Sequence, residues 1–152
     1  MRRWLLLLAG LALAGAGFGL FITRPIPLSQ PEIAALPTGD ALRGENVFWA
    51  GGCASCHATP KSEGDAHLVL AGGLELKTDF GIFVVPNISS SPEHGIGAFP
   101  IGDFASAMLK GVSPEGAHYY PAFPYGSYAR MTHEDISDLY AFMKTQIGRA
   151  HV

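Results

Sequence analysis

The sequence predicts a mainly α-helical protein, in which a small helical domain with a short β-hairpin follows an N-terminal transmembrane helix. Three observations predict this class. A long apolar run without a charge, Trp4–Ile22, stands near the N-terminus, and a compact motif, Cys53–His57, directly follows one helical pattern. A second helical pattern occupies the last part of the chain. A length of 152 residues suits one such domain with an appendage.

The apolar run Trp4–Ile22 is close to the roughly 20 residues that a helix needs to cross a membrane. Arg2 and Arg3 precede it, and flanking positive charge stays on the cytoplasmic side, so the rest of the chain is expected on the outer face. A cleaved signal peptide is the alternative, because Ala12–Ala14 and Ala14–Ala16 offer small-residue sites. The run continues past both sites, which favours an uncleaved, single-pass anchor over residues 1–23.

Residues 24–37 differ sharply in composition from the run before them. They contain Pro25, Pro27, Pro31 and Pro37, which forbid a continuous helix. We therefore expect an extended, fairly stiff tether that holds a domain over residues 38–145 just off the membrane.

Two amphipathic helices are predicted at the ends of this domain. The first runs from Gly39 or Asp40 to Ala50 and is stopped by Gly51-Gly52. The last follows Thr132, a good N-cap with Asp135 three residues on, and extends to about Thr145. Its apolar residues recur at helical spacing: Ile136, Leu139, Tyr140, Phe142 and Met143. Because each helix is too short to be stable alone, the two must pack on other parts of the domain.

The middle of the domain is predicted to hold a third helix, from about Ile101 to Lys110, and a small hairpin. Leu74, Leu76 and the run Ile82–Val85 suggest two short strands around a turn at Asp79–Gly81. A dense aromatic group follows, too apolar for plain solvent exposure: Tyr119, Tyr120, Phe123, Tyr125 and Tyr128.

The motif Cys53–His57 reads C-x-x-C-H, the attachment signature of a c-type haem. The thiols of Cys53 and Cys56 can each bond to a vinyl group of one porphyrin, while His57 supplies the proximal iron ligand. A redox dithiol would need a thioredoxin-like βαβ context, and a zinc site would need a further Cys/His pair. The sequence contains only these 2 cysteines, so it predicts one covalent haem c with its iron. In bacteria this attachment takes place outside the inner membrane, on the periplasmic side, which agrees with the predicted anchor.

With these features together, the chain resembles class I cytochromes c, in which an N-terminal helix crosses a C-terminal helix beside the haem. Gly44 and Phe48 resemble the small and aromatic pair of the first helix, and Leu139 and Phe142 the pair that they meet. The resemblance covers about residues 38–145. Five separated segments are also similar to haem domains of membrane-bound bacterial cytochromes, including the cytochrome subunits of alcohol, aldehyde, gluconate and related sugar dehydrogenases: Phe48–Cys53, Phe80–Gly81, Pro86–Ser89, Gly95–Gly97 and Tyr120–Tyr125. Those subunits usually carry three haem motifs and this sequence has one, so a single-haem relative fits better.

The resemblance also suggests the second iron ligand, because class I cytochromes c take a methionine from the loop ahead of the last helix. The matching residue is Met131, and Met108 in the predicted third helix is the alternative methionine. His94 and His118 are the histidine alternatives, whereas His67 and His133 are expected at the surface. Candidate polar contacts to the haem are Asn87, Tyr125 and Tyr128.

The expected function is that of a one-electron carrier between periplasmic or membrane-bound redox partners, and not of an enzyme. The expected partners are a dehydrogenase as donor and an oxidase or another cytochrome as acceptor. Two alternatives stay open: a fragment of a multi-haem dehydrogenase subunit, and a c-haem enzyme with an open distal site. The formal net charge is −3 and no run of Lys or Arg occurs, which argues against nucleic acid as a partner.

The last residues are expected to be foreign to the protein. Ile147–Val152 is what one reading frame of a common sequencing adapter encodes, so residues 146–152 are interpreted as an artefact. We therefore expect the genuine sequence to continue beyond Thr145.

Overall fold

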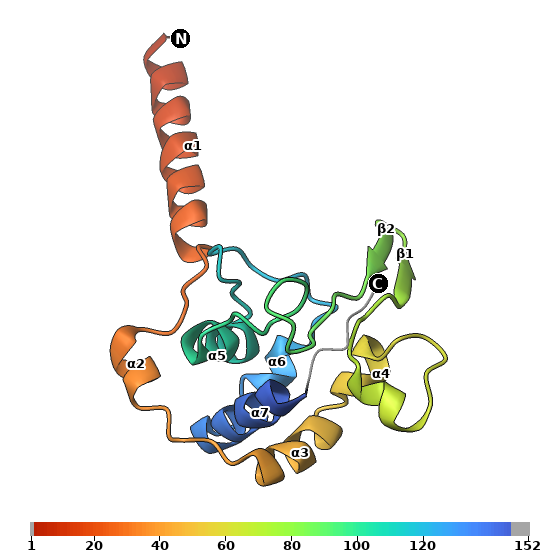
Figure 1. Ribbon diagram of the computed structural model, residues 1–152. Coiled ribbons are helices and arrows are strands. Elements are labelled where there is room, and N and C mark those ends of the chain that lie inside the picture. Colours follow the sequence, from red (N-terminus) through yellow and green to blue (C-terminus); the bar gives the residue numbers. More distant parts are fainter. Residues whose placement is uncertain (1, 147–152) are drawn as a thin grey trace.

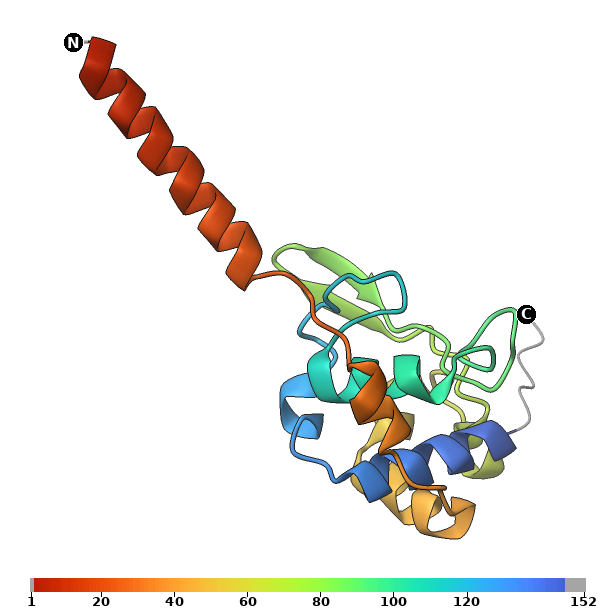
Figure 2. The same cartoon turned by 90° about the vertical axis from the view of Figure 1, so that its left-hand side faces the viewer.

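The computed structural model describes residues 2–146 and is mainly helical, as predicted, with α1 projecting away from a compact domain (Figures 1 and 2). The expected artefact Ile147–Val152 lies outside the described residues. Within the described part, the helices and strands are α1 (Arg2–Ile22), α2 (Gln30–Ala34), α3 (Ala41–Ala50), α4 (Cys53–His57), the 3₁₀ helix η1 (Gly64–Leu68), β1 (Glu75–Thr78), β2 (Gly81–Val84), α5 (Ile101–Lys110), α6 (Tyr125–Tyr128) and α7 (His133–Thr145).

The ends of the domain helices follow the predicted capping residues. The Asp40 carboxylate accepts from the backbone N–H groups of Leu42 and Arg43, which begins α3 one residue later. The Thr132 side chain accepts from the backbone N–H of Asp135, and the Asp135 carboxylate closes a capping box at the start of α7. Helix α5 has the predicted bounds Ile101–Lys110. Local sequence signals thus set these three helices.

Helix α3 crosses α7 at very close range, and Gly44 is the residue that allows it. A Cβ atom at position 44 would overlap the Asp138 carbonyl and would lie 2.8 Å from Cβ of Phe142. One turn later, the fully buried Phe48 packs against Phe142 with ring centroids 5.2 Å apart. Leu139, 2 % exposed, belongs to the same apolar core. The predicted crossing of the two helices is therefore present.

An ion pair closes the outer side of this crossing. Nε of Arg43 donates to Oδ2 of Asp138 at 2.7 Å and Nη2 donates to Oδ1 at 2.9 Å. The backbone N–H of Asp40 also donates to Oδ1 of Asp138, at 2.6 Å. The side chain of Asp138 is only 3 % exposed. The hydrogen bond from Arg43 holds the pKa of Asp138 below its usual value, although burial acts in the opposite direction.

The sequence analysis predicted an extended tether for the proline-rich segment, and the structure shows that this segment is not extended throughout. It contains α2, with Pro31 in the first turn and a capping box between Ser29 and Glu32. Leu28 is 6 % exposed, and its N–H donates to Oγ of Ser106 in α5 at 3.1 Å. The second half of the segment is thus docked on α5, because burying Leu28 and pairing its amide offset the loss of chain freedom.

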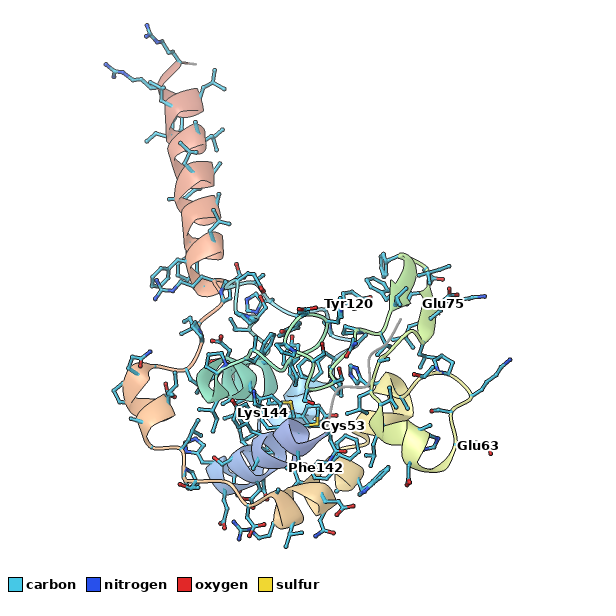
Figure 3. The ribbon with its side chains drawn as sticks, in the orientation of Figure 1. Cys53, Glu63, Glu75, Tyr120, Phe142 and Lys144 are labelled. Carbon is cyan, nitrogen blue, oxygen red and sulfur yellow. The ribbon has the colours of Figure 1, made fainter. Side chains whose placement is uncertain are left out.

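The predicted hairpin is present as the antiparallel pair β1–β2, joined by a two-residue turn at Asp79 and Phe80. Gly81 follows the turn with φ of 131°, a conformation that favours glycine. Phe83 of β2 stacks on Tyr120 with ring centroids 4.1 Å apart, which fixes the hairpin to the aromatic loop. Figure 3 shows Tyr120 beside this hairpin, on the other side of the molecule from Phe142.

Candidate haem site

The motif Cys53–His57 forms the one-turn helix α4 directly after α3. Gly52 links the two helices in the left-handed conformation, with φ of 68°, where a side chain would be strained. Oγ of Ser55 donates to the Gly52 carbonyl at 2.5 Å and holds the junction. Cys53 and Cys56 are three residues apart on this helix, so both thiols lie on one side of it. Cys53 is partly buried and Cys56 is exposed, and both are free.

The surroundings of the thiols do not resemble a dithiol or zinc centre. Burial raises the pKa of Cys53 to about 11, whereas the attacking thiol of a reactive dithiol has a lowered pKa. Across residues 2–146, no three His, Cys, Asp or Glu side chains come together as a metal-ion site would require. The thiols are therefore better suited to covalent attachment of a prosthetic group.

The imidazole of His57 is held by a backbone carbonyl 29 residues away. Nδ1 lies 2.8 Å from the carbonyl oxygen of Pro86, which places the ring proton on Nδ1 and leaves the lone pair of Nε2 free. Burial lowers the pKa of His57, so the neutral ring is favoured. A neutral, oriented imidazole whose other nitrogen donates to a carbonyl is the usual form of a metal-ligating histidine.

The loop at residues 70–73 connects the motif to the segment that carries Pro86. The N–H of Gly72 donates to the His57 carbonyl at 2.8 Å, and the N–H of Gly73 donates to the Val85 carbonyl at 2.9 Å. Gly72 has φ of 73°, and a Cβ atom there would lie 2.6 Å from the carbonyl carbon of Pro86. A glycine is thus needed for this approach, and the loop fixes Pro86 relative to His57.

Several apolar side chains within and after the motif are only partly buried. They pack against the core and come from α4, the loop after β2, α6 and the loops around it: Cys53, Ile88, Phe123, Tyr128 and Met131. Figure 3 shows Cys53 toward the centre of the domain, and Cys53 packs against the core cluster that contains Phe142 of α7. A porphyrin needs apolar walls, two thiols and an imidazole ligand. The residues present fit a covalently bound haem.

Met131, the predicted distal ligand, lies in the loop between α6 and α7 and is partly buried against the core. Its N–H donates to the Tyr128 carbonyl at 2.9 Å. Met108 is 6 % exposed and belongs to the apolar core, as a packing residue does. Met131 stays the predicted ligand because it combines partial burial with a position in a loop.

The histidine alternatives have other partners. His94 is exposed beside Glu93, with Nε2 3.9 Å from the Glu93 carboxylate. His118 is exposed, and its Nε2 lies 2.9 Å from the Thr23 carbonyl. His67 is partly buried rather than fully at the surface, because its ring contacts the Ser62 carbonyl at 2.6 Å. These contacts favour ordinary structural roles.

The aromatic group divides into two parts. Phe123 contacts Tyr119, Tyr125 and Tyr128 at centroid distances of 5.4, 6.2 and 5.8 Å, whereas Tyr120 stacks on the hairpin. An open hollow of about 310 Å³ lies along this segment, lined by Pro121, Phe123, Pro124, Tyr125, Gly126 and Ser127. None of the motif residues Cys53–His57 lines this hollow.

Two contacts of the site were not found by sequence reasoning. The hydroxyl of Tyr128, expected to contact the haem, donates to the Gly51 carbonyl at 2.8 Å and ties α6 to the junction before the motif. The Pro86 carbonyl supports His57, although Pro86 was noted only within a family-like segment. Asn87, the other expected polar contact, accepts from the Ser89 N–H at 2.8 Å. No local signal in the sequence identifies the pairing of Tyr128 with Gly51 or of Pro86 with His57.

The crossing of α3 and α7 beside a C-x-x-C-H helix with an oriented histidine defines a c-type cytochrome domain. The family model for cytochrome c matches residues 41–146, and the chain therefore belongs to the cytochrome c family. The family implies haem, iron and electron transfer.

Relatives of the chain are cytochromes and dehydrogenase subunits. It is 55 % identical over 148 residues to a diheme cytochrome c-type protein of Cereibacter sphaeroides, covering 95 % of this chain and 49 % of the relative. It is 41 % identical over 100 residues to the cytochrome c subunit of alcohol dehydrogenase (quinone) of Gluconobacter oxydans, covering 66 % and 20 %. It is 35 % identical over 139 residues to the fructose dehydrogenase cytochrome subunit of Gluconobacter japonicus, covering 90 % and 26 %. The chain thus spans about half or less of the length of these relatives.

Proposed function

We propose that this chain is a single-haem, one-electron carrier whose helix α1 anchors it in the bacterial inner membrane, with the haem domain in the periplasm. The observation that carries the proposal is the geometry of α4, where two thiols on one side stand beside an imidazole oriented by Pro86. Among the described residues, α1 is the helix long and apolar enough to cross a membrane.

Each residue of the site has a defined task in this function. Cys53 and Cys56 would hold the haem covalently, and His57 and Met131 would be the two side chains that bind its iron. When bound, the haem supplies reversible one-electron exchange at its iron. The Pro86 carbonyl makes His57 a better donor by polarising the Nδ1–H bond, while the thioether of Met131 and the apolar walls favour a higher reduction potential. An iron held by both of these side chains would leave no position for a substrate, which suits a carrier.

The proposed electron donor is a membrane-bound or periplasmic dehydrogenase, because relatives are named as cytochrome subunits of alcohol and fructose dehydrogenases. The proposed acceptor is an oxidase or another cytochrome. These partners fit a haem domain held near a membrane surface.

The covalent attachment is tested by producing the full chain in a bacterial host with a cytochrome c maturation system. The denatured protein is expected to keep one haem per chain on a haem-stained gel, because thioether bonds survive unfolding. Replacing Cys53 and Cys56 together by serine is the control and should remove the stain. Loss of all haem from the denatured wild-type chain would refute the proposal.

A second candidate function is supported by a specific observation. The diheme relative is about twice as long as the aligned part, since this chain covers 49 % of it, so the chain also fits one haem domain of a multi-haem cytochrome. The intact mass and haem content of the protein isolated from its native membrane separate the two. One haem supports the single-haem carrier, and two or more support the multi-haem subunit.

A further inference from the structure

The hairpin exposes an apolar row on its outer face. Phe80 is 88 % exposed, Ile82 59 % and Val84 62 %. Side chains alternate along a strand, so Ile82 and Val84 lie on one side of β2, and Phe80 precedes them in the turn, whereas Phe83 stacks on Tyr120 and Val85 is buried. An antiparallel hairpin at a protein surface usually turns polar residues outward. A clustered apolar row indicates a surface that another apolar phase covers.

Charged side chains of β1 share the outer face of the hairpin with this row, because directly paired residues lie on one face. Glu75 pairs with Val84 across the hairpin, and Lys77 pairs with Ile82. Asp79 precedes Phe80 in the turn. In Figure 1, β2 is the strand of the pair that lies nearer α1. The apolar row therefore follows β2, the strand nearer α1, while Glu75 and Lys77 follow β1 on the same face.

The chain between α1 and the domain is too short to let the domain move far from the end of α1. Helix α1 ends at Ile22, and Leu28 is already docked on Ser106. The carbonyl of Thr23 is additionally bonded by the ring of His118, which belongs to the domain. Five residues span at most about 18 Å when fully extended. The domain is thus held against the end of the apolar helix.

This constraint brings the hairpin to the level of the end of α1. Figure 1 shows the hairpin projecting from the domain toward the same side as α1, across the domain from it, and in both views its tip lies at the level of the C-terminal end of α1. Helix α3 lies at the opposite end of the domain in both views. If α1 crosses a membrane, the surface of that membrane passes close to the tip of the hairpin.

We propose that the row Phe80, Ile82 and Val84 is a second membrane contact, which enters the interfacial region of the bilayer crossed by α1 and fixes the orientation of the haem domain. The inference rests on the proposed anchoring. The occupant is the lipid surface because the tip of the hairpin lies at the level of the C-terminal end of α1 in both views and the chain that joins α1 to the domain is short. Apolar side chains at this depth lie about 5–10 Å into the headgroup boundary, where Lys77 and Asp79 can stay hydrated.

The test places a spin label at the row in the complete haem-loaded protein. Because Cys53 and Cys56 are bonded to haem there, Phe80→Cys provides the free thiol for a nitroxide. The matched control is Leu42→Cys, since Leu42 is 81 % exposed on α3, at the end of the domain away from α1. Ile82→Cys serves as a second reporter. The proteins are reconstituted into phosphatidylcholine vesicles, and collision rates with oxygen and with a water-soluble nickel chelate are measured by EPR.

At positions 80 and 82, we expect loss of accessibility to the nickel chelate and a gain for oxygen, whereas position 42 keeps the values of a label in water. Equal nickel accessibility at 80, 82 and 42 in protein that floats with the vesicles overturns the membrane contact and leaves the anchoring intact. Protein that does not float with the vesicles overturns the anchoring itself. Protection at position 80 that disappears when the protein is diluted in lipid indicates a second copy of the chain and also overturns the proposal.

Discussion

Gly44 is the point of closest approach between α3 and α7, and Gly44→Ala tests whether this crossing holds the haem domain together. Alanine is favoured over glycine inside a helix by about 1 kcal/mol, so helix propensity alone predicts stabilisation. The new Cβ would overlap the Asp138 carbonyl and press on Cβ of Phe142 at 2.8 Å. The obstacle is backbone, which cannot rotate away, so the upper end of the usual 1–3 kcal/mol cost of overpacking applies, roughly 3 kcal/mol.

The net expectation is a loss of about 2 kcal/mol, which corresponds to a fall of roughly 10 °C in Tm for a domain of this size. The assay is thermal unfolding of the haem-loaded protein in mild detergent, followed by the haem absorption band and by far-UV circular dichroism. Gly126→Ala is the control, because a Cβ there meets nothing within 4 Å. A Gly44→Ala protein that unfolds at or above the wild-type temperature would refute the reasoning.

Two further predictions concern acid stability and the segment before α3. Arg43 lowers the pKa of Asp138 in the folded protein. The ionised carboxylate therefore contributes fully to the free energy of unfolding above the pKa of about 4 that it has in the unfolded chain, and this contribution is lost as the pH falls through the lower pKa of the folded state. Asp138→Asn should lower the free energy of unfolding by about 2 kcal/mol at pH 7 and weaken its fall at acid pH, as measured by denaturant titration at several pH values. An unchanged loss of stability at acid pH would contradict this role of Asp138. A chain beginning at Pro25 should leave the membrane fraction and still bind haem. A chain beginning at Pro31 should have a free energy of unfolding about 2 kcal/mol lower, because it lacks Leu28. Equal stability of the two chains would contradict the docking of Leu28 on α5.

The parts of the fold that were predictable depend on signals within a few residues of each other. Asp40 and Thr132 cap their helices through backbone groups two or three residues away. The motif Cys53–His57 is contiguous, so the sequence alone predicted the covalent attachment. The segment before α3 shows that proline content alone does not exclude a helix. Pro31 stands in the first turn of α2, where its missing N–H costs nothing. Ser29 and Glu32 form the S-x-x-E capping signal that could have revealed this helix.

The remaining features depend on contacts between distant parts of the chain. The Pro86 carbonyl that orients His57 is a backbone group 29 residues away, and the Gly51 carbonyl that receives the Tyr128 hydroxyl is 77 residues away. No periodicity encodes such pairs. In the stretch Gly81–Val85, residues on both faces of the strand are apolar, so alternation could not tell which face is covered by the domain.

The central claim is that Met131 and His57 fill both axial positions of one haem iron, and the absorption spectrum of Met131→Ala tests it most directly. The wild-type oxidised protein should show the weak sulfur-to-iron charge-transfer band and its reduced form should not bind carbon monoxide readily. Met131→Ala should lose the band, lower the reduction potential and bind carbon monoxide. Met108→Ala is the matched control, expected to cost about 2–5 kcal/mol of stability as a packing change while keeping the band. A Met131→Ala spectrum identical to wild type, or tight carbon monoxide binding by the wild type, would contradict the account and favour a c-haem enzyme with an open distal site.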